Sequence, residues 1–150
     1  MARERKKLER ISAVRDARLF IIATEGEQTE KQYFEDLVSK NWYGYFLALS
    51  NPCFELWLLL HIKSLEEYPD NALDEFLENK KVSSSRTRLE AELINLLNSY
   101  NKSNLDTAQF LPFVKQAIER AKKLDTNPKQ RWSNGLGTRV YQLVEKIIVG

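Results

Sequence analysis

The sequence predicts an α/β protein in which a front part that mixes strands and helices precedes a helical back half. Two observations support this prediction. Short apolar runs that end in turn residues occur at 18–24 and 45–50 and are typical of buried strands. Beyond residue 65, apolar residues instead recur at helical spacing. A chain of 150 residues has the size of a single domain with one core.

The first predicted unit is a strand, a tight turn and a helix. The strand RLFIIAT at 18–24 is rich in Ile and Phe and is followed by a turn that contains Gly26. The next residues, EGEQTEKQYFEDL, favour a helix, because Thr29 and Gln32 have the spacing of a capping box. This unit places an acidic turn at the end of a buried strand.

The second predicted unit is the strand YFLALS at 45–50, followed by the apolar helix in SNPCFELWLLLHI at 50–62. Asn51 followed by Pro52 is typical of a helix N-cap and first turn. Glu55 is the only acidic residue in this helix, and it misses the third helical position that a capping box needs. Because an ionised carboxylate on an apolar helix is costly unless paired, Glu55 should face either an Arg in a structural salt bridge, or a metal or ligand cleft.

Three amphipathic helices are predicted in the back half. Their apolar stripes lie within residues 89–100, 110–124 and 140–148, and Thr87 with Glu90 can cap the first of them. Two polar, basic segments, 79–88 and 125–137, contain Ser, Pro or Gly and are predicted to be loops. These helices are expected to supply most of the packing.

Composition excludes several classes of protein. A single cysteine, Cys53, rules out an intrachain disulfide, and with one histidine, His61, it leaves no Cys/His zinc cluster. We expect His61 to be a packed residue and Cys53 a small buried one. No apolar run is long enough to cross a bilayer, so we expect a cytoplasmic protein without membrane contact.

Nucleic-acid binding, if present, must be local, because the formal net charge is only +2. The candidates are Arg86, Arg88, Lys129 and Arg131 in the basic loops, with Trp132 able to stack on a base. The basic N-terminal arm would add to this charge. The alternative is an ordinary solvated surface.

Three acidic residues, Glu25, Glu27 and Glu30, follow the first predicted strand. Ligands bind at the carboxyl ends of strands in open α/β sheets, and Mg²⁺ takes oxygen ligands of this type. These residues are therefore candidate metal ligands, together with Glu55. The alternative is that they only favour a helix N-terminus through the helix dipole.

The segments IIATEGEQTEKQYFEDL, SNPCFELWLLLHI and GTRVYQLVEKI resemble the RloB family, also called AbiLii-like, of bacterial anti-phage abortive-infection proteins. The resemblance implies a toprim-like (Rossmann-like) fold with a small parallel sheet, flanking helices and a partner ATPase. It implies a nuclease-type site in which Glu25 is a metal ligand and Glu27 or Glu30 is the second acid. Glu55 and Asn51 would complete the catalytic group.

The resemblance suggests one RloB-like domain over residues 1–150, with a basic arm at 1–16, an α/β core at 17–64 and a helical part at 65–150. The chain departs from the family pattern where a second acidic motif, usually Asp-x-Asp, is expected. Only VSKNWYG separates the first helix from the second strand, and no Asp lies between Asp36 and Asp70.

Two interpretations of this departure remain open. The chain is an internally shortened natural member, or the complete protein contains a segment that this chain lacks. The first functional hypothesis is a Mg²⁺-dependent nuclease-type domain with weak metal binding. The second is a catalytically inactive module that docks on the partner ATPase or on nucleic acid. Loss of a central strand would also expose sheet edges and favour self-association.

Overall fold

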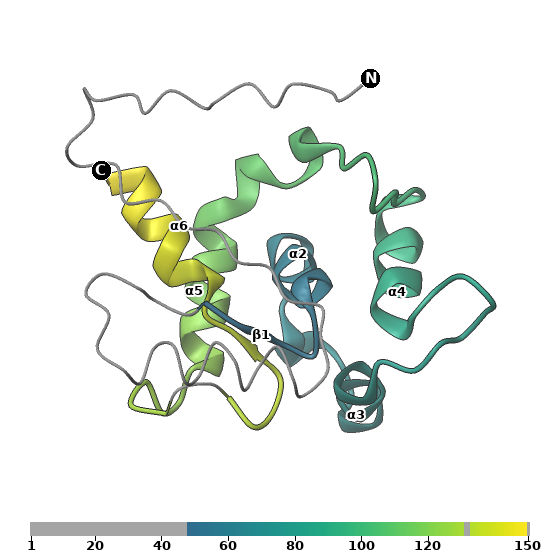
Figure 1. Ribbon diagram of the computed structural model, residues 1–150, viewed down its shortest axis with the longest axis horizontal. Coiled ribbons are helices and arrows are strands. Elements are labelled where there is room, and N and C mark those ends of the chain that lie inside the picture. Colours follow the sequence, from purple (N-terminus) through teal and green to yellow (C-terminus); the bar gives the residue numbers. More distant parts are fainter. Residues whose placement is uncertain (1–47, 131–132, 150) are drawn as a thin grey trace, which may run out of the picture.

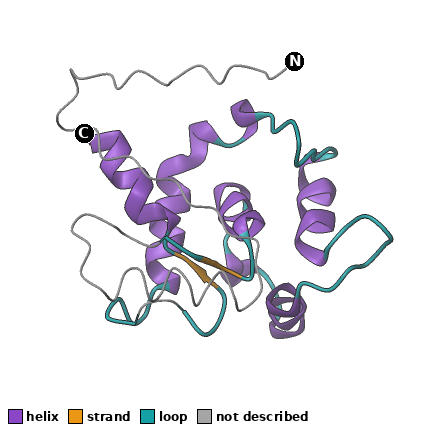
Figure 2. Cartoon of the chain, viewed as in Figure 1, coloured by secondary structure: helices purple, strands orange, loops and turns teal. Residues whose placement is uncertain are grey.

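The computed structural model describes residues 48–130 and 133–149, and the statements below concern these residues. They form a helix-rich α/β structure (Figures 1 and 2). The α-helices are α2 (Phe54–Ile62), α3 (Asp70–Glu78), α4 (Arg88–Leu97), α5 (Val114–Leu124) and α6 (Val140–Val149). The strands are β1 (Ser50–Asn51) and β2 (Gly137–Thr138), and short 3₁₀ turns lie at Leu65–Glu67, Thr107–Gln109 and Leu111–Phe113.

The two strands pair antiparallel, with Ser50 opposite Thr138 and Asn51 opposite Gly137. A hydrogen bond of 2.7 Å between the hydroxyls of Ser50 and Thr138 adds to this pairing. The α/β class is confirmed in this coarse sense. The predicted strand at 18–24, and with it the predicted parallel sheet, lies outside the described residues.

The core is built around α2, which lies between α4 and α5 (Figure 1). Its residues 56–60 are all buried, because a helix that is apolar on every side needs neighbours all round. One side of α2 receives the α5 stripe, and the other receives α4, whose Leu89 and Leu93 are fully buried. Phe76 of α3 closes the core beside α4.

The capping box predicted for α4 is confirmed. The Thr87 hydroxyl accepts a hydrogen bond from the Glu90 backbone N–H, and the Glu90 carboxylate accepts one from the Thr87 N–H at 3.2 Å. The helix ends at Leu97, because Asn98 adopts a left-handed conformation with φ of 62°. Tyr100, predicted to lie on this helix, is therefore buried from the loop that follows.

The predicted N-cap at Asn51 is wrong. The helix begins at Phe54, and Cys53 occupies the cap position without a side-chain capping bond. Asn51 instead ends β1, where its backbone pairs with Gly137. The stripe predicted over 110–124 likewise begins its α-helix only at Val114, after the 3₁₀ turns. No helix in the described parts of the chain combines the length and apolarity needed to cross a membrane.

Candidate functional site

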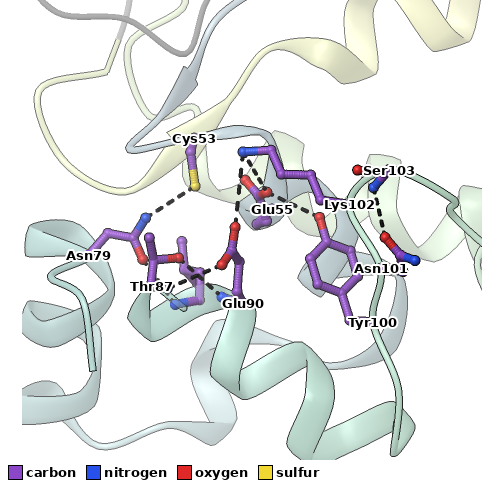
Figure 3. A network of polar contacts seen from close by, with 10 residues as sticks. Cys53, Glu55, Asn79, Thr87, Glu90, Tyr100, Asn101, Lys102 and Ser103 are labelled. Carbon is purple, nitrogen blue, oxygen red and sulfur yellow. Dashed lines mark hydrogen bonds and ion pairs between the residues drawn. The ribbon is translucent and has the colours of Figure 1, made fainter. Parts of the chain in front are cut away.

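Glu55 lies in the first turn of α2 and is only 3% exposed. The Tyr100 hydroxyl donates a hydrogen bond of 3.1 Å to its Oε1, and the Lys102 ammonium lies 3.7 Å from the same atom (Figure 3). The cation facing Glu55 is therefore a lysine rather than the arginine that the salt-bridge interpretation expected. An acidic side chain in the first helical turn is also favoured by the helix dipole.

A second buried carboxylate, Glu90, faces the same lysine. Its Oε1 lies 4.0 Å from the Lys102 ammonium, and Glu90 is 8% exposed. Figure 3 shows the Lys102 side chain reaching across to both acids from the loop after α4. Two acidic side chains thus share this ammonium, whose positive charge offsets part of their negative charge.

Cys53 lies beside this acidic pair at the start of α2. Its Sγ accepts a hydrogen bond of 3.4 Å from the Asn79 side-chain amide (Figure 3). Burial, followed by the negative charge of Glu55, raises the pKa of the Cys53 thiol to about 12. The thiol is therefore protonated at neutral pH and is not suited to nucleophilic chemistry.

Tyr100 is held as a neutral hydrogen-bond donor. Burial and the charge of Glu55 raise the pKa of its phenol. Because the phenol keeps its proton, its hydrogen bond to Glu55 persists over the ordinary pH range. The polar cluster is thus a fixed carboxylate site, in which Tyr100 and Lys102 orient the acid.

His61 is a packed residue, as predicted. Its ring makes edge contacts with Trp57 and Phe110, and its Nδ1 is 2.9 Å from the Trp57 carbonyl. Burial lowers the pKa of His61, which favours the neutral ring. His61 therefore belongs to the core rather than to the polar cluster.

The side chains of Asn51 and Glu55 have different hydrogen-bond partners. Its side-chain amide donates hydrogen bonds to the carbonyls of Ser133 and Gly135, at 3.1 and 3.0 Å. The Arg139 backbone N–H donates to the Leu49 carbonyl at 2.8 Å. The segment before α6 is thus attached to the segment before α2, and Asn51 helps to hold these segments together.

Sequence reasoning missed a second polar cluster, formed by Asp125, Arg139 and Tyr141. Arg139 Nη2 donates to Asp125 Oδ1 at 3.2 Å and to the Asn127 carbonyl at 3.0 Å. The Tyr141 hydroxyl donates to Asp125 Oδ2 at 2.8 Å. The signal that could have found this cluster is the GTRVY stretch, which contains both Arg139 and Tyr141.

The predicted nucleic-acid residues do not form one described group. Arg88 contacts Glu75 and Glu92 at 2.9 and 3.1 Å, and its guanidinium lies over the Phe76 ring. Arg88 therefore contributes to the packing of α3 against α4. Arg86 lies between α3 and α4, and Lys129 lies after α5 and is exposed. Arg131 and Trp132 lie outside the described residues.

Only one of the predicted metal ligands lies in the part of the chain that the structure describes. Glu55 is described, whereas Glu25, Glu27 and Glu30 lie outside the described residues. Within residues 48–130 and 133–149, no three His, Cys, Asp or Glu side chains are grouped so that they could hold a metal ion. The described part therefore supplies one carboxylate, Glu55, from the predicted set.

Comparison with known proteins gave one result. A family model described as RloB-like protein matches residues 38–147, which is most of the chain. The match includes both polar clusters and the segments attached through Asn51. No match was found among curated proteins or among solved structures.

Proposed function

This chain belongs to the RloB-like family, and from that premise we propose that it is a toprim-like, phosphodiester-handling domain of a bacterial anti-phage system. In its complete form this domain would use Mg²⁺ to cut nucleic acid in the cytoplasm, together with a partner ATPase. The family resemblance in the sequence supports this proposal, as does the presence of a buried carboxylate at the start of α2.

The observation that carries the proposal is the way in which Glu55 is held. The carboxylate is buried within an apolar helix, yet it is oriented by Tyr100 and faces Lys102. Fixing a carboxylate in this way costs desolvation energy, which packing alone does not require. A prepositioned acid of this kind is a common component of sites that bind a hard cation or a phosphate-bound metal.

The roles follow the family pattern. Glu25 would be the principal metal ligand, Glu27 and Glu30 would lie beside it, and Glu55 would be a supporting ligand. Bound Mg²⁺ would stabilise negative charge on the reacting phosphate. The described residues fit this role only in part, because the Lys102 ammonium already faces Glu55 and Glu90. Asn51 would serve by holding the loop before β2 in place.

A second candidate function is a catalytically inactive module that docks on the partner ATPase or on nucleic acid. The sequence favours this alternative because no Asp lies between Asp36 and Asp70. Cleavage requires carboxylates on both sides of the metal, and the paired aspartates of the family pattern are missing. We therefore expect this chain alone to show little or no turnover, even with saturating Mn²⁺.

Two measurements separate the candidates. The first is the melting temperature during titration with Mg²⁺ or Mn²⁺ into the millimolar range, for wild type and for Glu25→Gln. Glu119→Gln is the matched control, because Glu119 is exposed on α5. The proposal expects a rise that Glu25→Gln removes and Glu119→Gln keeps. No rise in the wild type would remove the metal site.

The second measurement assays binding and cleavage of single- and double-stranded DNA and RNA. Metal-dependent cleavage that is lost in Glu25→Gln would establish the nuclease and exclude the inactive module. Binding without cleavage, weakening steeply with added salt, would favour the module. Lys129→Ala tests the exposed loop contribution, and Arg88→Ala is a poor test because it also removes the contacts with Glu75 and Glu92.

A further inference from the structure

A short hairpin projects from the described part of the chain between α3 and α4 (Figures 1 and 2). Lys81 and Thr87 pair across it in a single antiparallel bridge. Two backbone hydrogen bonds of 2.9 Å flank this bridge, and they join Val82 to Arg86 and Arg88 to Lys80. Residues 80–88 therefore form a short two-stranded ribbon with residues 83–85 at its tip, which we call the 80–88 hairpin.

The base of the hairpin is tied to two helices. Asn79, directly after α3, has a left-handed φ of 44°, which turns the chain into the hairpin. Its side-chain carbonyl accepts a hydrogen bond from the Leu89 N–H at 2.9 Å, and its amide donates to Cys53 Sγ (Figure 3). On the return side, the capping box of Thr87 and Glu90 fixes the entry into α4. The hairpin is therefore held at a fixed position relative to α2 and α4.

The tip of the hairpin faces outward. Val82 is 56% exposed, and residues 83–85 are three exposed serines. They offer a partner a small apolar surface and three hydroxyl groups, each of which can donate and accept a hydrogen bond.

The four basic side chains of the hairpin differ in how far their charges are offset. Lys80 lies 2.9 Å from Glu78, and Arg88 is held by the two acids described above. Lys81 and Arg86 form no ion pair with any residue in 48–130 or 133–149. The charges of these two residues are therefore available to an anionic partner.

Lys81 and Arg86 belong to opposite faces of the hairpin. Successive side chains of paired strands alternate between the two faces. Lys81 therefore shares a face with its bridge partner Thr87, whereas Arg86 shares the other face with Val82, the residue across from it. A phosphate chain along one face would reach only one of these cations. A hairpin placed between two phosphate chains would present one cation to each.

We propose that the 80–88 hairpin enters the major groove of duplex DNA, with Lys81 and Arg86 contacting the phosphates on its two sides. The major groove is about 12 Å wide and about 8.5 Å deep, and it admits a two-stranded ribbon. The three residues from the bridge at Lys81 to Ser84 span about 10 Å, so the tip reaches the groove floor. The deep, narrow major groove of duplex RNA excludes such a ribbon. This inference rests on the proposed function and names its substrate class.

The first measurement is the binding of a short fluorescent DNA duplex, of an RNA duplex of the same sequence and of each single strand, followed by anisotropy in EDTA. Lys81→Ala and Arg86→Ala should each weaken duplex DNA binding about tenfold at about 50 mM salt, and each should lower the salt dependence of log K by about 1. Lys115→Ala is the matched control, because Lys115 is exposed on α5. This control should leave binding unchanged, and all three variants should keep the wild-type melting temperature.

The second measurement locates the contact on the protein. Ser84→Cys places a thiol at the hairpin tip, and Gln116→Cys places one on the exposed surface of α5. The natural Cys53 adds little background, because its pKa is raised to about 12. Duplex DNA should slow the reaction of the tip thiol with iodoacetamide and leave the α5 thiol unaffected.

Preference for duplex DNA, weakened by both hairpin substitutions and accompanied by protection of the tip thiol, supports the proposal. Equal or tighter binding of duplex RNA or of single strands overturns it. So do hairpin substitutions that act no more strongly than Lys115→Ala, an unprotected tip thiol, or no binding of any nucleic acid. Because these measurements use neither metal nor Glu25, the two proposals can fail separately. Metal-dependent cleavage that survives unchanged in Lys81→Ala and Arg86→Ala would keep the nuclease and remove the hairpin contact.

Discussion

Replacing Lys102 with Met should destabilise the protein, because it removes the ammonium that faces two buried carboxylates. Glu55 and Glu90 lie 3.7 and 4.0 Å from Lys102 Nζ, and their side chains are 5% and 10% exposed. Breaking a fully buried ion pair costs about 3–5 kcal/mol. The Lys102 side chain is 47% exposed and Tyr100 still donates to Glu55, so solvent screening and this hydrogen bond reduce the cost.

The expected loss is about 1–2 kcal/mol of unfolding free energy, or about 2–8 °C in melting temperature for a chain of this size. Urea denaturation followed by tryptophan fluorescence measures it, and an unchanged slope with denaturant shows that the folded state is intact. Adding Mg²⁺ should restore more stability in Lys102→Met than in wild type, because a divalent cation could then replace the ammonium between the acids.

Lys123→Met is the matched control. Lys123 lies 3.7 Å from Glu66, the same separation as between Lys102 and Glu55, but these side chains are 66% and 72% exposed. Screening by solvent should leave this substitution without a measurable effect. If Lys102→Met is equally neutral, the carboxylates of Glu55 in α2 and Glu90 in α4 are hydrated and do not form a buried charged cluster, and the reasoning is refuted.

Three further results are expected. Thr87→Ala should cost about 1 kcal/mol in a urea titration, because it removes half of the capping box with Glu90, while Ser84→Ala in the exposed loop should cost nothing measurable. Burial lowers the pKa of His61, so its stabilising contribution is complete above the unfolded pKa of about 6.5 and is lost as pH falls through the lower folded value; His61→Leu should flatten this part of the stability curve. Cys53, with a pKa of about 12, should react with iodoacetamide far more slowly than an unfolded control at neutral pH, as followed by mass spectrometry, and equal rates would contradict its burial.

Features set by neighbouring residues could be predicted from the sequence. The capping box of Thr87 and Glu90 depends on two positions three apart, and the continuous apolar run of α2 identified a buried helix. The helix α3 was not predicted as a separate element, although its Phe76 is fully buried. It is short and largely polar, so its apolar stripe is weak.

Features set by distant residues could not be predicted. Asn51 is a residue type that often caps a helix, but here its backbone pairs with Gly137. Its side-chain amide donates to the carbonyls of Ser133 and Gly135 instead of capping α2. The partners of Glu55 likewise lie in another loop, more than forty residues along the chain. No spacing rule joins Glu55 to Tyr100, since their contact depends on where α4 ends and how the following loop crosses α2.

The pairing of β1 with β2 also has a consequence for the order of folding. It joins Ser50 to Thr138, which requires the closure of a long loop. The helices α3 and α4, by contrast, follow one another in the chain and pack against each other. The two-residue strands contribute few hydrogen bonds of their own, so the pairing depends on α2, α5 and α6 already being packed. We therefore expect the junction of β1 with β2 to form late in folding. It should also be among the first parts to open in native-state hydrogen exchange.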